Sequence, residues 1–374
     1  MTVTVGVLAE TAPGETRVAV TPEVASKLKA LGAAVLMQSG AGSLAHFPDS
    51  QYADAQFAPA DAVLAGADVL LKVQPPALEE IAALREGAVA IGFMQAYARG
   101  DVVRALRDRR ITSFAMELIP RISRAQSMDA LSSQAAVAGY KSVLIAANAL
   151  EKFLPMLTTA AGTIRPATVL VIGAGVAGLQ AIATARRLGA VVEAYDVRAA
   201  TKDQIKSLGA KFVDTGVSAE GAGGYARDLT EEEKAKQQAI LDARIAASDI
   251  VITTASVPGR AAPRIVGEAA VARMRPGSVI VDIAAEQGGN CALTRAGQTV
   301  AHGGVKIIGP VNLPATLPFH ASEMYSRNLF NLLKPAFANA ELRIDWADDV
   351  FAGAVLTHDG QIKHEATRKL VEGN

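Results

Sequence analysis

The sequence predicts an α/β protein with two doubly wound, Rossmann-like domains, each built on a mostly parallel sheet. Short apolar runs alternate with helical patterns along the whole 374-residue chain, which is the rhythm of βαβ units. A chain of this length suits two domains of ordinary size. A helical stretch over residues 127–153 interrupts the rhythm and is long enough to connect two domains.

The first half contains a series of short apolar runs that predict strands. A helix is expected to begin at Pro22 with Thr21 as its N-cap, because threonine is favoured at the N-cap and proline at the first helical position. Helical patterns also cover residues 77–85 and 102–109. The predicted strands are 3–8, 34–37, 69–73, 88–91 and 112–115.

The rhythm restarts after the connecting helix. A tail over residues 342–374 is too short for a domain, so we expect it to pack on the N-terminal half. We therefore predict one domain from residues 1–128 plus 335–374 and a second from residues 129–334. The elements predicted for the second half are strands 168–172, 191–195, 250–254, 279–283 and 305–308, and helices 176–188 and 320–336.

Composition excludes several classes of function. Lys plus Arg and Asp plus Glu both total 37, and this balance argues against nucleic acid as a partner and against general attraction to anionic membranes. The one cysteine, Cys291, excludes an intramolecular disulfide and a Cys-cluster metal site, so we expect no metal and a reducing, cytosolic compartment. No segment reaches the roughly 18 apolar residues of a membrane helix, and the first residues lack a signal-peptide pattern.

The strongest local motif is a glycine fingerprint for a dinucleotide. Gly173, Gly175 and Gly178 form G-x-G-x-x-G between a predicted strand and a predicted helix. The first glycine permits a tight turn, the second lets the backbone approach a pyrophosphate, and the third lets helix and strand pack closely. The diphosphate is then expected at the positive N-terminus of the helix.

An acidic residue completes the fingerprint. Asp196 ends the next predicted strand, 18 residues after the last glycine, where it can accept hydrogen bonds from the adenosine ribose hydroxyls. A carboxylate there repels a 2′-phosphate, which favours NAD(H) over NADP(H). Arg198 is a counter-indication, because a nearby arginine can accept that phosphate.

Residues 214–227 form a long glycine-rich segment between a strand and a helix. Loops of this length inside a compact domain are usually functional or disordered. From the residues alone, a functional loop and an ordinary surface insertion are equally compatible with it.

The residues that hydride transfer to a hydroxy or amino acid would need are missing around the fingerprint. Such a reaction needs a proton-transfer group beside the substrate, most often histidine. No histidine lies between residues 47 and 301. The sequence therefore favours a nucleotide reaction in which no proton has to move.

Long segments of the chain resemble a known family. The segments include MELIPRISRAQSMDALSSQAAVAGYKSV, GAGVAGLQAIATARRLGAVVEAYDVRAATK, AGGYARDL, ETRVAVTPE and ITTASVPGRAAP. They resemble the soluble NAD(H)-binding component (domain I, the first portion of the alpha subunit) of proton-translocating NAD(P) transhydrogenases. The resemblance runs over nearly the whole chain and implies two α/β domains separated by a cleft.

Alanine dehydrogenase, in the same wider superfamily, is the main rival. Arg17 and Lys72 match its substrate arginine and lysine. Its catalytic histidine is replaced here by the segment with Met94 and Gln95, and its later aspartate by Glu286. These departures remove the amino-acid chemistry, and leave Arg17 and Lys72 as possible structural relics.

The resemblance also implies a set of site residues. A segment near the nicotinamide matches Arg121, Gln126, Asp129 and Ser132, with Arg124 as a further cofactor contact. Taken alone, an arginine here also suits a surface ion pair, and Asp129 suits the first turn of a helix. A mobile loop that closes over bound nucleotide matches the glycine-rich segment with Tyr225. The further nucleotide-contacting positions are Val176, Val197, Arg198, Gly224, Gln237 and Ser256.

The implied reaction is direct hydride transfer between NADH on this chain and NADP⁺ on a partner subunit, coupled to proton translocation. The implied assembly is a homodimer with NADP(H)-binding and membrane-spanning subunits, peripheral on the cytoplasmic face of the inner membrane, with no direct membrane insertion. Two alternatives remain open: an alanine dehydrogenase-like enzyme and a nucleotide-sensing binding module.

Overall fold

The chain forms two compact units. The computed structural model describes residues 2–198, 200–217, 230–256 and 259–373. The first unit comprises Met1–Gln134 with Pro314–Asn374, and the second comprises Ala135–Leu313. The expected boundaries at residues 128 and 335 differ from this division, because residues 314–334 contribute Tyr325 and Leu329 to the core of the first unit.

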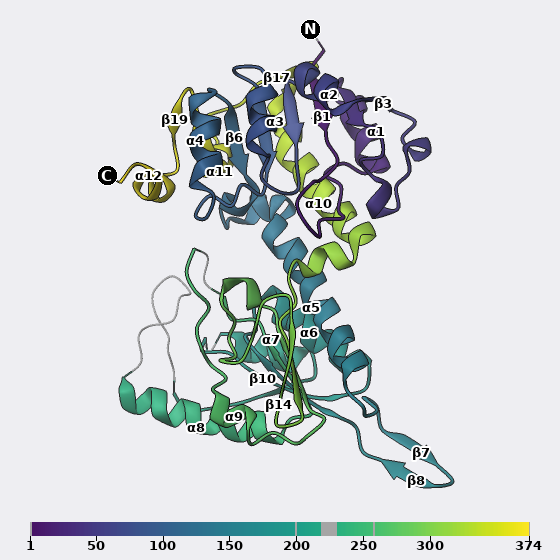
Figure 1. The fold of residues 1–374 in the computed structure, drawn as a ribbon, viewed down its shortest axis with the longest axis vertical. Helices are drawn as coiled ribbons and strands as arrows, with labels where there is room; N and C mark the ends of the chain where they lie inside the picture. Colours follow the sequence, from purple (N-terminus) through teal and green to yellow (C-terminus); the bar gives the residue numbers. More distant parts are fainter. Residues whose placement is uncertain (1, 199, 218–229, 257–258, 374) are drawn as a thin grey trace. The chain divides into compact units, whose positions relative to one another are not determined.

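The first unit is built on a largely parallel sheet (Figure 1). Its strands are β1 (Thr4–Val7), β2 (Ala34–Gln38), β3 (Ala55–Ala58), β4 (Val69–Leu71), β5 (Val89–Gly92), β6 (Thr112–Ala115), β18 (Val355–His358) and β19 (Gln361–Ile362). They lie in the order β19-β18-β6-β5-β4-β1-β2-β3. The strand order runs outward from β1 on both sides, so the topological switch point lies between β1 and β4.

Helices cover both faces of this sheet, as a doubly wound fold requires. Neighbouring strand residues alternate between two cores: Val69 and Leu71 face one, and Leu70 faces the other. One core is closed by α1 (Pro22–Ala30), α10 (Pro318–Leu333) and α11 (Asp349–Ala354), and the other by α2 (Ala60–Gly66), α3 (Leu78–Ala83) and α4 (Gly100–Asp108).

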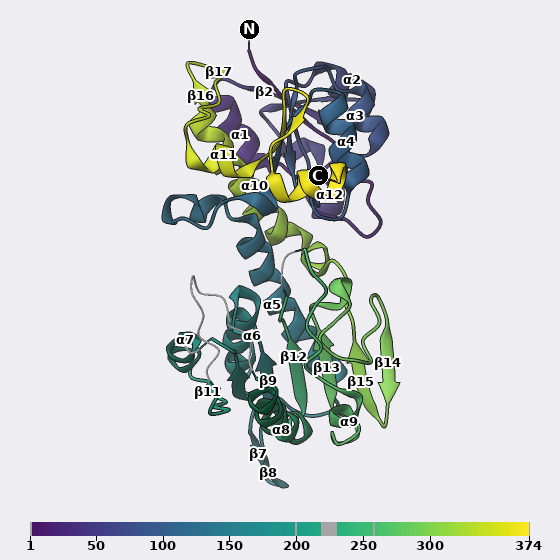
Figure 2. The same cartoon turned by 90° about the vertical axis from the view of Figure 1, so that its left-hand side faces the viewer.

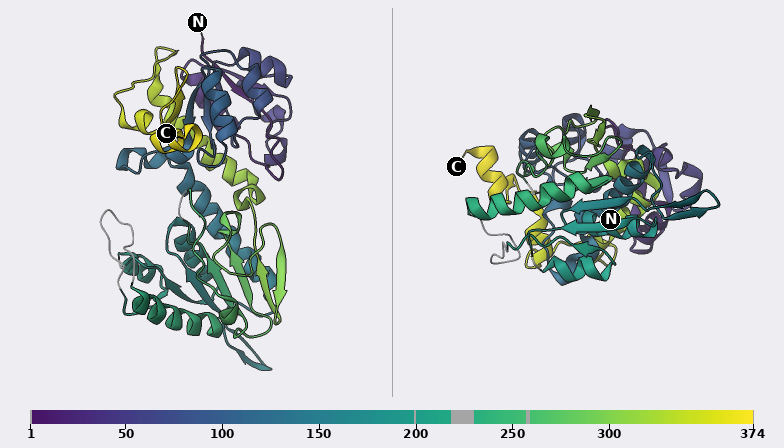
Figure 3. Two further views of the ribbon diagram at one scale, coloured as in Figure 1. Left: turned by 60° about the vertical axis from the view of Figure 1, so that its left-hand side comes forward. Right: turned by 90° about the horizontal axis from the view of Figure 1, so that it is seen from below.

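The C-terminal tail belongs to the first unit. Strand β18 pairs antiparallel with β6, and β19 pairs antiparallel with β18. Helix α12 (Glu365–Glu372) follows, and the yellow C-terminal segment lies against the N-terminal half (Figure 3). The short hairpin of β16 (Phe337–Ala338) and β17 (Glu341–Leu342) precedes the tail.

The second unit has its own largely parallel sheet (Figure 2). Its strands are β9 (Thr168–Ile172), β10 (Val191–Tyr195), β11 (Lys211–Phe212), β12 (Ile250–Thr253), β13 (Val279–Asp282), β14 (Thr299–His302) and β15 (Val305–Ile308). The order is β11-β10-β9-β12-β13-β15-β14, with β14 antiparallel to β15. Together the two units confirm the predicted fold class, and the strand predictions match to within two residues at each end.

The helices of the second unit also divide between two faces. Helix α5 (Ala130–Ala149) crosses the division between the units, and its second part packs with α6 (Val176–Arg187) and α7 (Thr201–Ser207) on one face. Helices α8 (Glu231–Ala247) and α9 (Glu268–Val271) cover the other. The helix predicted over residues 127–153 is shorter, because its first part is the 3₁₀ helix η4 (Ser123–Met128).

An unpredicted hairpin extends from the second unit (Figure 1). Strands β7 (Leu157–Thr159) and β8 (Gly162–Ile164) pair with each other, and every residue in them is exposed. Beside it, Phe153 and Met156 are 53% and 64% exposed. Among the described residues, no helix is long and apolar enough to cross a membrane.

A glycine contact between α5 and α6 yields a stability prediction. A Cβ on Gly139 would lie 2.1 Å from the carbonyl oxygen of Ala177, so Gly139→Ala should force the helices apart and destabilise the second unit by about 1–3 kcal/mol. Gly100→Ala is the control, since its Cβ would meet its nearest neighbour at 3.5 Å. Urea denaturation followed by circular dichroism measures both. Equal stability of the two variants would contradict the contact.

Candidate functional site

The switch point of the second sheet lies at β9, which has β10 on one side and β12 on the other. Open α/β sheets bind ligands outside the carboxyl ends of their strands at this point. Gly173 follows β9 directly, and helix α6 begins three residues later. The predicted fingerprint therefore lies at the switch point.

Each glycine of the fingerprint has a separate steric reason. Gly173 has a φ of +98°, and a Cβ there would lie 2.5 Å from Thr254 Oγ1. A Cβ on Gly178 would lie 1.8 Å from the carbonyl oxygen of Gly173, so only glycine lets α6 approach the turn. A Cβ on Gly175 would meet no described atom within 4 Å. The space above the turn is therefore open at Gly175, where backbone and ligand can approach.

The first turn of α6 faces this open space. Gly175 is the N-cap residue, and Val176, the first helical residue, is 44% exposed. A helix N-terminus presents backbone N–H groups and a positive dipole end, which suit a diphosphate. The turn and the helix together fit the phosphate part of a dinucleotide.

Asp196 lies directly beside the glycine turn. Its Oδ2 accepts a hydrogen bond from the backbone N–H of Ala174 at 2.7 Å. Burial opposes ionisation of this carboxyl, but the bonds from Arg198 and Ala174 outweigh it, so the pKa of Asp196 lies below its usual value. The residue is an anion at neutral pH.

The Arg198 side chain occupies the remaining acceptor positions of Asp196. Its Nε donates to Oδ1 and its Nη2 donates to Oδ2, both at 2.9 Å, while its backbone N–H also donates to Oδ1 at 2.9 Å. A carboxylate offers about four lone-pair sites. A ribose diol can therefore reach Asp196 only where the guanidinium turns away, and at 41% side-chain exposure it has room to do so.

A hollow of about 250 Å³ adjoins Asp196. Val197, Phe212 and Lys202 help to line it, and Lys202 lies over the Phe212 ring at 5.6 Å. The hollow lies beyond the carboxyl ends of β10 and β11, on the adenosine side of a dinucleotide bound at a Rossmann switch point.

The remaining predicted contacts of the second unit lie on two elements. Ser256 is exposed after β12, and Gln237 is partly buried in α8. Gly224 and Tyr225 lie outside the described residues, so the closing loop stays a prediction. The sequence analysis missed Asn290, which is fully buried and binds the N–H and the carbonyl of Ala255 at 3.0 and 2.8 Å.

In the first unit, Asp129 and Ser132 lie together at the start of α5. Asp129 Oδ1 accepts from the backbone N–H of Ser132 at 2.9 Å, and Oδ2 accepts from its hydroxyl at 2.5 Å. This is an N-cap arrangement, so the helix-start interpretation of Asp129 holds. Two of its four acceptor sites remain for a ligand.

The other predicted residues of this segment differ in their surroundings. Arg121 and Gln126 are exposed. Arg124 makes a bidentate ion pair with Asp348, with both N–O distances at 2.8 Å. The surface ion pair considered for this arginine is therefore present.

Arg17 and Lys72 are buried in the first unit and paired with carboxylates of the chain. Arg17 binds Glu15 at 2.6 Å, with side-chain exposures of 3% and 0%. Lys72 lies 3.2 Å from Glu80 and 3.5 Å from Glu10. Burial raises the pKa of Glu10 despite the charge of Lys72. Both cations are thus neutralised by the chain itself.

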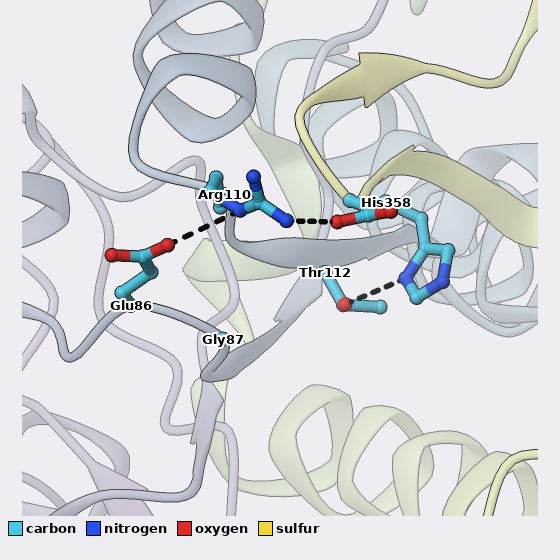
Figure 4. A pocket seen from close by; sticks show the side chains of 6 residues that line it. Glu86, Gly87, Arg110, Thr112 and His358 are labelled. Carbon is cyan, nitrogen blue, oxygen red and sulfur yellow. Dashed lines mark hydrogen bonds and ion pairs between the residues drawn. The ribbon is translucent and has the colours of Figure 1, made fainter.

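A second hollow, of about 490 Å³, lies in the first unit (Figure 4). Arg110 pairs there with Glu86 at 3.1 Å and with Asp359, and Thr112 Oγ1 lies 3.0 Å from His358 Nδ1. The hollow is at the amino-terminal end of β6, opposite to the edge where parallel sheets bind ligands. Within the part of the chain that the structure describes, no group of three His, Cys, Asp or Glu residues suits a metal ion.

Family models match nearly the whole chain. Residues 6–138 match the N-terminal domain model of alanine dehydrogenase/PNT, and residues 142–365 match the C-terminal domain model. A crystal structure titled as transhydrogenase from Sinorhizobium meliloti is 45% identical, covers 96% of this chain and 99% of its own, and superposes with a TM-score of 0.88.

Curated relatives agree with these models. The first of the separate alpha-subunit chains of the NAD(P) transhydrogenase of Rhodospirillum rubrum is 47% identical, over 96% of this chain and 97% of its own length. The alanine dehydrogenase of Mycobacterium tuberculosis is 34% identical, over 76% of this chain and 73% of its own. The predicted resemblance is confirmed: the chain belongs to the alanine dehydrogenase/PNT family, and is more similar to these transhydrogenase members than to that alanine dehydrogenase.

Proposed function

We propose that this chain is the NAD(H)-binding catalytic component of a proton-translocating transhydrogenase. Hydride passes directly from NADH on this chain to NADP⁺ on a partner subunit. The observation that carries the proposal is the glycine turn with the anionic Asp196 at the switch point of the second sheet. The names of the relatives supply the reaction class.

The second unit holds the nucleotide in this proposal. The first turn of α6 binds the diphosphate, and Asp196 accepts the ribose hydroxyls after Arg198 releases it. The hollow beside Asp196 receives the adenosine. Val176, Val197, Gln237 and Ser256 complete the contacts, together with Gly224 and the closing loop of Tyr225.

The segment before α5 orients the nicotinamide. Gln126 and Asp129 hold the carboxamide and ribose, and Arg121 pairs with the diphosphate or carboxamide side. Ser132 orients Asp129 through the 2.5 Å hydrogen bond. Bound NADH supplies the hydride, and no proton is exchanged at that step, so no general base is required. Orientation of the ring accounts for much of the rate.

An alanine dehydrogenase-like function is the second candidate, and Arg17 and Lys72 are the observation that favours it. Both cations are occupied by Glu15, Glu10 and Glu80. A substrate carboxylate would have to displace these buried partners. The second candidate is therefore less well supported than the first.

The proposed assembly is a homodimer with NADP(H)-binding and membrane-spanning partners, held on the cytoplasmic face of the inner membrane through those partners. The exposed β7–β8 hairpin supports association, because an isolated two-stranded hairpin is marginally stable in water. Leu157 and Ile164 in it are 36% and 46% exposed.

A stopped-flow experiment tests the function. The chain is mixed with purified NADP-binding partner, NADH and a spectrally distinct NADP⁺ analogue, and hydride transfer should be rapid without a membrane. NADH loss that depends on pyruvate and ammonia, without the partner, would instead identify the dehydrogenase. Silence with a demonstrably bound partner would identify a sensing module.

Asp196 should determine NADH affinity. Loss of its charge-assisted hydrogen bonds in Asp196→Ala should weaken NADH binding roughly ten- to hundredfold and narrow the preference over NADPH. Fluorescence titration measures both nucleotides. The control is Asp203→Ala, an equal charge change on the exposed surface of α7. Equal NADH affinity in the two variants would remove Asp196 from the ribose site.

Gln126 and Asp129 should affect the reaction more than binding. Gln126→Ala and Asp129→Asn should slow single-turnover hydride transfer roughly tenfold or more while NADH affinity changes less. Asparagine keeps the N-cap of α5, so the helix start is preserved. Ser123→Ala in the same 3₁₀ helix is the control. Weakened binding with an undiminished rate would reverse the assignment.

A further inference from the structure

The first unit contains a buried polar network at the switch point of its own sheet. Glu10, Lys72 and Glu117 follow the carboxyl ends of β1, β4 and β6. The side chains of Glu10 and Lys72 are each 2% exposed. Gln74 links the two parts of this cluster, because its backbone N–H donates to Glu10 at 3.3 Å and its amide donates to Glu15 at 2.8 Å.

Arg17 carries the network out of the sheet to α5. Two of its nitrogens, Nε and Nη2, bind Glu15, while Nη1 donates to Gln134 Oε1 at 2.8 Å. Gln134 Nε2 in turn donates to Ser133 Oγ at 3.2 Å and to the carbonyl of Ala321 on α10 at 3.1 Å. Gln134 is 6% exposed. The charge cluster thus fixes the start of α5.

The network ends on the segment that precedes α5. Ser133 Oγ donates to Asn328 Oδ1 at 2.7 Å, and Asn328 Nδ2 donates to the carbonyl of Ser127 at 2.8 Å. Asn331 donates to the same carbonyl at 3.0 Å. Ser127 lies in η4 between Gln126 and Asp129, two of the residues assigned to the nicotinamide.

Apolar packing contributes little to holding this segment. Of residues 121–127, only Ala125 is buried; the others are exposed. A segment with few buried apolar contacts opens locally at low free-energy cost. Its position therefore depends on polar anchors, and the Ser127 carbonyl is where the buried network reaches it.

We propose that Asn328 is a positioning residue for hydride transfer: the network Arg17–Gln134–Ser133–Asn328 sets the place of η4, and thereby of Gln126 and Asp129. This rests on the proposed function for its effect on rate, but not for its effect on the segment. It gives the buried Arg17 a role that needs no amino-acid substrate.

The test compares two equal substitutions on α10. Asn328→Asp keeps the acceptor for Ser133 but replaces the donor to Ser127 with a carboxylate oxygen. Asn331→Asp is the matched control, because Asn331 donates to the same carbonyl from a partly exposed position and is outside the network. Ser133→Ala is a milder variant that frees the Asn328 amide without adding charge.

Hydrogen–deuterium exchange of the isolated chain reports on the segment. Asn328→Asp should raise exchange in peptides covering residues 121–129 roughly tenfold, because an unsatisfied buried group replaces a hydrogen bond. Asn331→Asp should raise it less than about threefold, because its exposed carboxylate can turn to solvent. Ser133→Ala should fall between the two.

Single-turnover hydride transfer with the NADP-binding partner reports on function. Asn328→Asp should slow it roughly tenfold, with the NADH dissociation constant within about threefold of the wild type. Faster exchange and slower transfer are both required, and either one without the other overturns the proposal. If the wild-type chain transfers no hydride with its partner, the proposed function fails, and exchange alone decides whether Asn328 holds the segment. Should Asn328→Asp not fold, Ser133→Ala decides by the same two criteria.

Discussion

Both oxygens of the Asp196 carboxylate are bound by the chain itself, and the second unit is organised around this group. The Ala174 N–H holds one oxygen against the glycine turn, and the Arg198 guanidinium spans both. The turn cannot shift, because Gly178 packs on the Gly173 carbonyl with no space for a side chain. A rigid turn, an open helix N-terminus and an anion with an exchangeable partner are the physical requirements for binding a dinucleotide without a 2′-phosphate.

The two switch points of the molecule are used differently. At the second sheet the turn leaves open space over Gly175, whereas the first sheet fills its switch point with its own charges. Burying Glu15, Arg17 and Lys72 is costly unless each is paired and hydrogen-bonded, and each is. In the proposed account these charges support the segment before α5, so one fold provides a binding edge in one unit and a supporting edge in the other.

The sequence predicted regular elements and the fingerprint well, because apolar runs and glycine spacing are local signals. It could not predict the β7–β8 hairpin, whose residues are exposed and carry no alternating pattern. The division near residue 314 was also missed, because α10 belongs to the first unit through contacts such as that of Asn328 with Ser127, 201 positions apart. Arg124 was assigned to the cofactor by resemblance, while its partner Asp348 lies in the distant tail. Such long-range pairings leave no trace in a single sequence.

A crystal structure of the chain with bound NADH tests the central claim most directly. The account predicts the diphosphate at the first turn of α6, the adenosine ribose hydroxyls on the Asp196 carboxylate, and the Arg198 guanidinium turned away from at least one of its oxygens. A nucleotide bound at another edge of the molecule would contradict the account. So would an intact Asp196–Arg198 pair with the ribose hydroxyls held by other groups.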